Sequence, residues 1–351
     1  METPLKSSSI PAGAEPGESS KRLDLTIVCC VELGRLEEQT ILMVRSLRRF
    51  GGRLADSPVI AVLGRRGPAL RPATLSEFER LRVRVVHAQP ADNPAPWLNY
   101  ANKVAGVVVA DRIAQTAQIA WFDSDMFVLA EPSGLLLRDG EDLAAQCHPL
   151  PPARLEGDTT HDDYWTRVCA LFGVTLTDVE WIAGADGVAG QQLNFTSGLF
   201  AWRRGSGFAG RYREAFQTLL ASRIAQRSGE FFTADQVVLT PIVTKYRMAW
   251  RNLSVEDHSI VLGEFLARRS SLLPDFGKAR VLHYSDAFAA PFRAQMEDRL
   301  KQQAPDFARW LSDQRVHLGA MPVRSRLAKR LYAVARGLRY RRFARNVLRA
   351  N

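Results

Sequence analysis

The strongest constraint on the fold is the alternation of strand and helix patterns from residue 23 to residue 122. Four short apolar runs predict buried strands: 23–32, 57–64, 83–88 and 119–122. Three segments between them predict helices: 37–52, 74–83 and 97–114. Strands that alternate with helices predict a parallel sheet with helices on both faces. We therefore expect an α/β fold whose ligand site lies beyond the carboxyl ends of the strands.

Two carboxylates interrupt the apolar character at the end of the fourth predicted strand. In "IAWFDSDMFVLAEP", Asp123 and Asp125 stand between buried-looking segments. An unpartnered carboxylate so close to a core is costly. Residues i and i+2 of a strand point the same way, so both carboxylates can converge on one hard divalent cation such as Mg²⁺ or Mn²⁺. The alternative for so short a motif is a solvated loop or a cap for the next element.

Three further motifs lie in the second half of the chain. His283, in "RVLHYSD", could complete a mixed oxygen and nitrogen site, or could be a hydrogen-bonded core histidine. Asp235 and Gln236 stand at a predicted helix start, where a carboxylate is favourable in any case and where the pair could also grasp a hydroxylated ligand. Gly198 lies inside a predicted strand, which indicates close approach of another group to the backbone.

The remaining pattern predicts fewer regular elements and a division of the chain into three parts. Signals are weak from 132 to 190, and later segments predict two strands, two helices and a terminal helical region: 194–205, 279–286, 210–227, 229–246 and 294–313. Residues 1–22 are rich in Pro, Gly, Ser and Glu and predict a disordered leader. We expect a catalytic domain over 23–292 and C-terminal helices with a basic tail over 293–351.

The excess positive charge is concentrated in the C-terminal tail. The net charge is +10, yet 322–351 contains ten basic residues and no acidic one, so the rest of the chain has 37 of each sign. Four apolar residues of the tail recur at helical spacing: Leu327, Leu331, Val334 and Leu338. This pattern is typical of a helix at an anionic membrane surface. Nucleic-acid binding, which the neutral body disfavours, and a helix packed on the body are the alternatives.

Location is predicted from absent signals and from the cysteines. The chain has neither an apolar secretory signal near its start nor an apolar run of about 20 residues, the length that spans a membrane. Cys29 and Cys30 are adjacent in a predicted strand and point to opposite faces, so they are poor disulfide partners. We expect reduced thiols and a cytoplasmic protein, held peripherally at the inner face of the cytoplasmic membrane by the tail.

Four stretches, in order, resemble the nucleotide-sugar glycosyltransferases of the GT-A fold. They are "FDSDMFVLAEP", "NFTSGLF", "ADQVVL" and "VLHYSDAFAAPF", and the resemblance covers about 23–292. It is strongest to the family 8 glycosyltransferases, which include glycogenin and bacterial lipopolysaccharide galactosyltransferases. The resemblance implies a Rossmann-like GT-A fold and a metal-dependent hexosyltransferase. It implies transfer of a sugar from a nucleotide-diphosphate sugar, with a UDP-sugar favoured, to a glycan or lipid-linked acceptor with retention of configuration.

The resemblance also implies roles for individual residues. Asp123, Asp125 and His283 would bind Mn²⁺ or Mg²⁺, which would hold the diphosphate of the donor. Glu32 would contact the base and ribose, and Lys103 would lie near the sugar nucleotide. The implied donor-sugar contacts are Asn194, Thr196, Ser197, Gly198, Asp235 and Gln236. Of these, Asp235 and Gln236 would be catalytic, with Asp235 stabilising positive charge at the anomeric carbon.

Two departures from the family pattern leave alternatives open. Thr196 stands where the family usually has Asn, and no Lys follows His283 at the place where the family neutralises the leaving phosphate. Three basic residues could substitute for it: Lys278, Arg280 and Arg293. A non-catalytic sugar-nucleotide-binding protein is therefore the main alternative. An Asp-X-Asp phosphohydrolase is disfavoured because Phe127 occupies the position where that class has Thr or Val.

Overall fold

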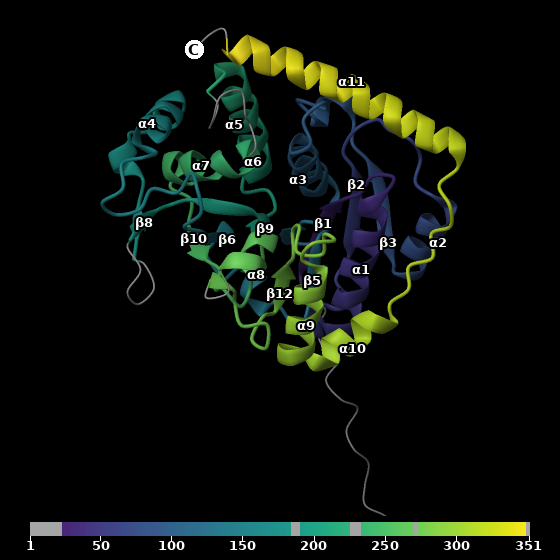
Figure 1. Ribbon diagram of the computed structural model, residues 1–351. Helices are drawn as coiled ribbons and strands as arrows, with labels where there is room; N and C mark the ends of the chain where they lie inside the picture. Colours follow the sequence, from purple (N-terminus) through teal and green to yellow (C-terminus); the bar gives the residue numbers. More distant parts are fainter. Residues whose placement is uncertain (1–22, 184–189, 225–232, 270–271, 349–351) are drawn as a thin grey trace, which may run out of the picture.

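A seven-stranded sheet forms the centre of the protein (Figure 1). The computed structural model describes residues 23–183, 190–224, 233–269 and 272–348. The strand order is β10-β6-β9-β4-β1-β2-β3. The strands are β1 (Leu25–Cys30), β2 (Val59–Leu63), β3 (Val83–His87), β4 (Gln118–Phe122), β6 (Leu143–Cys147), β9 (Phe195–Arg203) and β10 (Trp250–Asn252). Only β9 runs antiparallel to its neighbours, so the predicted mostly parallel α/β sheet is confirmed.

Helices cover both faces of this sheet because the strands are apolar on both sides. In β1, Ile27 and Cys29 face one hydrophobic cluster and Val28 faces another. The first cluster contains α1 (Arg35–Phe50) and α2 (Pro72–Arg80). The second cluster contains α3 (Ala101–Ile113), α5 (Phe208–Ser222) and α7 (Leu239–Tyr246). Continuous burial of this kind is the pattern of a parallel sheet between two helical layers.

A second sheet brings a late part of the chain back to the middle of it. Its strands are β5 (Met126–Val128), β12 (Val281–His283) and β11 (Ser259–Ile260), with β12 antiparallel to β5. The helix α8 (Gly263–Arg268) precedes β12 in the chain, and α9 (Arg293–Gln303) and α10 (Pro305–Asp313) follow it. A third apolar cluster, which includes Phe127, Leu282, Met296 and Phe307, holds β5 and β12 against α9 and α10.

The remaining elements belong to neither of these two sheets. They are α4 (Asp162–Leu171), α6 (Ala234–Val237), α11 (Val323–Leu348), β7 (Trp181–Ile182), β8 (Gln191–Gln192) and short 3₁₀ turns at 52–54, 90–92, 133–135 and 176–178. Figure 1 shows α11, in yellow, as one long helix along an outer edge of the molecule. Within the described ranges, no helix is both long enough and apolar enough to cross a lipid bilayer.

Several element boundaries differ from the sequence predictions. The helix expected from residue 97 begins at Ala101, because Leu98 and Ala101 close successive turns before it. Thr74 does not open α2, which begins at Pro72; its hydroxyl donates to Glu37 instead. The helix expected over 229–246 is, where it is described, the two short helices α6 and α7. The expected leader, 1–22, lies outside the described residues.

Candidate active site

The site lies where the strand order of the large sheet reverses. The chain adds β2 and β3 on one side of β1 and then places β4 on the other side. Such a reversal leaves a crevice at the carboxyl ends of the two strands beside it. Glu32 follows β1, while Asp123 and Asp125 follow β4 directly. Because β1 and β4 are parallel neighbours, Glu32, Asp123 and Asp125 all follow strands at the same carboxyl edge of the sheet.

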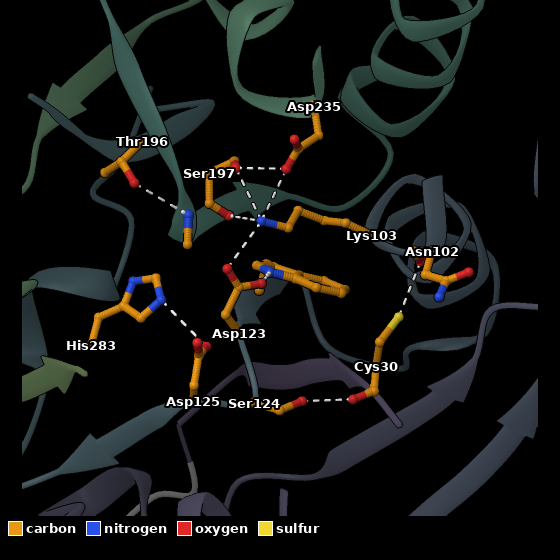
Figure 2. A network of polar contacts seen from close by, with 12 residues as sticks. Cys30, Asn102, Lys103, Asp123, Ser124, Asp125, Thr196, Ser197, Asp235 and His283 are labelled. Atoms are coloured by element: carbon orange, nitrogen blue, oxygen red, sulfur yellow. Dashed lines mark hydrogen bonds and ion pairs between the residues drawn. The ribbon is translucent and has the colours of Figure 1, made fainter. Parts of the chain in front are cut away.

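The second sheet brings His283 to the two carboxylates. In the β5–β12 pair His283 lies opposite Met126, and the Tyr284 N–H donates to the Asp125 carbonyl oxygen at 3.0 Å. His283 Nε2 is 3.3 Å from Asp125 Oδ1 (Figure 2). One ligand atom from each of Asp123, Asp125 and His283 lies within 4.8 Å of the others. Two carboxylate oxygens and one imidazole nitrogen suit a divalent ion such as Mn²⁺ or Mg²⁺.

Lys103 joins this group to a second set of polar residues. Its Nζ donates to Asp123 Oδ2 at 3.1 Å and to the Ser197 carbonyl at 2.8 Å, and it pairs with Asp235 Oδ2 at 3.1 Å. The Ser197 hydroxyl donates to the same Asp235 oxygen at 2.7 Å. The Trp121 indole donates to the other Asp123 oxygen at 2.7 Å. Figure 2 shows Asp123, Ser197 and Asp235 gathered around this ammonium group. They come from the residue after β4, from β9 and from α6, and Lys103 belongs to α3.

Burial and neighbouring charges shift the pKa values of these groups in opposite directions. Burial raises the pKa of Asp123, although Lys103 and His283 oppose it. Burial would also raise the pKa of Asp125, but the charge and hydrogen bond of His283 reverse the shift and lower it. Burial would lower the pKa of Lys103, and Asp123 and Asp235 raise it instead. Since three carboxylates face one ammonium group and one imidazole, the site favours an added cation.

Glu32 occupies the same edge but makes a separate ion pair. Its carboxylate receives two hydrogen bonds from Arg65, at 2.5 and 3.0 Å, and one from Asn102 at 2.7 Å. Asn102 precedes Lys103 in α3, so the two parts of the site are adjacent. Arg65 also lines a cavity of about 610 Å³. The other walls of this cavity are the segments that follow β2 and β3 and the helix α11.

The remaining predicted residues lie at different distances from this network. The Asn194 amide donates to the His148 and Leu150 carbonyls at 2.9 and 3.0 Å, so it fixes a loop and is not joined to the network. The Thr196 hydroxyl accepts from the Gly198 N–H at 3.4 Å beside the site. Gln236 is partly buried in α6, directly after Asp235.

The His283 ring has two close neighbours, Gly198 and His258. The sequence indicated a close approach at Gly198 but did not identify His283 as the group that approaches it. A Cβ on Gly198 would lie 2.6 Å from that ring, which explains the glycine inside β9. His258 Nε2 lies 3.3 Å from His283 Nδ1, and the two rings stack. His258 is fully buried, burial lowers its pKa well below the usual value, and its Nδ1 has no partner among the described residues. Sequence reasoning missed His258 because one histidine in a loop carries no pattern.

Each of the three basic residues considered as substitutes for the absent lysine pairs with a carboxylate outside the Asp123, Asp125 and Asp235 group. The pairs are Lys278 with Asp275 at 4.0 Å, Arg280 with Asp257 at 2.9 Å and Arg293 with Glu297 at 2.8 Å. A different cation, Lys329 of α11, lies against Gly34 just beyond β1; a Cβ there would be 2.0 Å from its Nζ. Lys329 forms no ion pair with any carboxylate in the described part of the chain.

The sheet reversal, the acidic pair at a strand end and the buried lysine network define an α/β protein whose candidate site lies at one sheet edge. The chain belongs to the Rhodobacterales glycosyltransferase domain family, whose model matches residues 27–247. The predicted glycosyltransferase identity is therefore confirmed, and the seven-stranded, mostly parallel sheet agrees with the GT-A fold that the sequence resemblance implied. The matched range includes Asp123, Asp125 and Asp235, while His283 and α11 lie beyond it.

Several solved structures are similar to this chain. The glycosyltransferase GlyE of Streptococcus pneumoniae TIGR4 is 14% identical with a TM-score of 0.46; the match covers 82% of this chain and 63%, less than two thirds, of that one. Galactosyltransferase LgtC, in complex with donor and acceptor sugar analogs, is 14% identical with a TM-score of 0.46, over 78% and 95%. Mouse xyloside xylosyltransferase 1 is 13% identical with a TM-score of 0.43, over 74% and 97%. A comparison with curated proteins found no match.

Proposed function

We propose that this glycosyltransferase is metal-dependent and moves a hexose from a nucleotide-diphosphate sugar to an acceptor hydroxyl. A UDP-sugar is the favoured donor, and retention of configuration follows the resemblance to family 8. The observation that carries the proposal is the convergence of Asp123, Asp125 and His283 beyond β4. We assign the catalytic domain to 23–292 and treat 293–351 as an extension that carries α11.

The three converging side chains would hold the metal ion. Their donor set fits Mn²⁺ or Mg²⁺, and the excess of carboxylates over ammonium groups leaves negative charge for the ion to balance. A divalent ion bound there would stabilise the charge that develops on a leaving nucleoside diphosphate.

The chain's own residues would position the donor sugar. Lys103 and Ser197 fix one Asp235 oxygen, and the Tyr212 hydroxyl donates to the Asp235 backbone carbonyl at 2.8 Å. Asp235 is 1% exposed, so its carboxylate is held rigidly in a poorly solvated place. There it would stabilise positive charge at the anomeric carbon, with Gln236 beside it. Glu32 would accept hydrogen bonds from the ribose at the other end of the site.

A turnover assay on the purified chain tests the proposal. With Mn²⁺ and a panel of UDP- and GDP-sugars, we expect slow hydrolysis of one donor, measured as release of the nucleoside diphosphate. Asp125→Asn should reduce the rate by about 100-fold or more, because a charged ligand is lost. The same change at the largely exposed Asp163 of α4 serves as the control and should leave the rate unchanged.

Other outcomes of the same assay identify the competing functions. Nucleotide binding that raises the melting temperature, without hydrolysis of any sugar donor or transfer to an added glycan, would favour a non-catalytic binding protein. Release of inorganic phosphate from a phosphomonoester would favour a phosphohydrolase. Donor hydrolysis that survives both excess EDTA and Asp125→Asn would overturn the metal-dependent mechanism.

A further inference from the structure

The outer side of α11 carries an apolar stripe that no described part of the chain covers. Its members are between 58% and 70% exposed: Val323, Leu327, Leu331, Val334 and Leu338. Spacings of three and four residues place them on one side of the helix. A contiguous exposed apolar surface on a helix normally marks a contact with another body.

Arginines flank this stripe on both sides along the helix. From 322 to the end of the chain there are ten basic residues and no acidic residue, whereas the rest of the chain is balanced. Seven exposed arginines lie in the described part of α11: Arg324, Arg326, Arg330, Arg339, Arg341, Arg342 and Arg345. The partner must therefore offer apolar surface and negative charge together.

The inner side of α11 is already occupied by the body of the protein. Tyr340 and Phe343 pack on Trp97, with ring centroids 6.2 and 4.7 Å apart. Lys329 lies against Gly34, and Arg336 lines the cavity of about 610 Å³ at the ends of β2 and β3. These contacts fix the rotation of the helix, which lies along an outer edge of the molecule in Figure 1, and the apolar stripe is left exposed.

We propose that α11 docks the protein on an anionic lipid bilayer through its outer side while its inner side stays packed on the body. Leucine and valine enter the acyl boundary, and the arginines bind anionic headgroups. Nucleic acid would complement the charge of the arginines but offers no apolar surface to cover the stripe. A second copy matches the stripe but would bring two sets of arginines together, which charge repulsion opposes.

The geometry also places the candidate site close to the bilayer. The cavity under α11 is lined by Arg65, which donates to Glu32 at the carboxyl edge of the sheet, and Glu32 also accepts from Asn102 of α3, the neighbour of Lys103. A docked α11 therefore presents this edge to the membrane surface, where a lipid-linked acceptor would be found. This second part rests on the proposed function, whereas bilayer binding itself does not.

Vesicle co-sedimentation of the full chain, without nucleotide or metal, tests the docking. We expect binding to vesicles of 70% phosphatidylcholine and 30% phosphatidylglycerol, weak binding to pure phosphatidylcholine, and weakening in high salt. Leu331→Ser with Leu338→Ser should reduce the partition coefficient by about tenfold or more. Leu75→Ser, at an exposed leucine of α2, is the matched control and should bind as the wild type does.

Three results would overturn bilayer docking, and a fourth would overturn the packed inner side. One is equal binding of the wild type and the double serine variant. Another is a wild-type dimer in solution that the double serine variant dissociates, and the third is tight binding to duplex DNA without binding to vesicles. Faster hydrogen exchange around Trp97 on docked protein would refute a packed inner side. Asp125→Asn should still bind vesicles, which separates this test from that of the proposed function.

Discussion

His283 is held by neighbours on both sides of its ring. Gly198 allows the β9 backbone to lie against the ring, and His258 Nε2 faces its Nδ1. If His283 Nδ1 carries the proton, it donates to His258, and Nε2 is left to face Asp125 and a cation. Gly198 and His258 are therefore positioning residues that orient the His283 imidazole.

Gly198→Ala should weaken Mn²⁺ binding by about tenfold, because the added methyl must displace the His283 ring. Isothermal titration without nucleotide measures this directly. Gly210→Ala in α5 is the control, since a Cβ there meets nothing within 4 Å. It should leave the affinity unchanged and add up to about 1 kcal/mol of stability. Equal affinities for both variants would contradict the packing argument.

His258→Phe should also weaken Mn²⁺ binding by about tenfold, because His283 Nδ1 loses its partner and the ring its fixed orientation. His258→Gln, whose side chain can still accept a hydrogen bond, should restore most of the affinity. The matched control is His317→Phe at an exposed position. Equal Mn²⁺ affinities of His258→Phe and His258→Gln would show that His258 contributes only by packing.

At the scale of an element, the start of α1 depends on one buried carboxylate. Glu37 is fully buried and accepts hydrogen bonds from Gly34 N, Arg71 N and Nε, and the Thr74 hydroxyl, at 2.7 to 2.9 Å. It therefore joins the loop after β1 to α2. Helical periodicity could indicate α1 but not this partner set, because Arg71 and Thr74 come from another element.

Glu37→Gln should lower the free energy of unfolding by about 3 kcal/mol, because the amide cannot accept four donors and leaves the Arg71 charge unpaired. Urea denaturation measures the change. Glu38→Gln, at the exposed neighbouring position of α1, should change it by less than about 0.5 kcal/mol. Similar losses in both variants would show that the charge of the helix start, not the buried network, is responsible.

At the scale of the whole molecule, the parts that depend on local pattern were predictable. Alternating periodicity indicated β1 to β4 and their helices, and residues at strand ends converge on one edge, as Asp123 and Asp125 do. The placing of β9 between β4 and β6, and of His258 against His283, depends on contacts between distant segments. No periodicity encodes such pairings, so they had to come from the structure.

Acid should destabilise the whole fold through His148. Burial lowers the pKa of His148 from 6.5 to about 4, so between these values the unfolded chain binds a proton that the native chain excludes. Stability contributed above pH 6.5 is therefore lost as the pH falls towards 4, by about 2 kcal/mol after allowance for solvent screening. Unfolding measured from pH 7.5 to 4 should show this slope.

His148→Gln should reduce the slope of that part of the pH profile, since no titrating group is left at position 148, and the slope contributed by buried His258 should remain. His87→Gln, at an exposed histidine, should keep the wild-type slope. A slope that is unchanged in His148→Gln would assign the acid sensitivity to another group.

The pairing of β12 with β5 has a consequence for biosynthesis. A nascent polypeptide can emerge from the ribosome with all seven strands of the large sheet and still lack the imidazole that β12 delivers. Asp123 and Asp125 would then be two of the three proposed metal ligands, and the third would be missing until β12 has been translated and has paired with β5. Under the proposed function, a partly translated chain that lacks β12 would not turn over the donor.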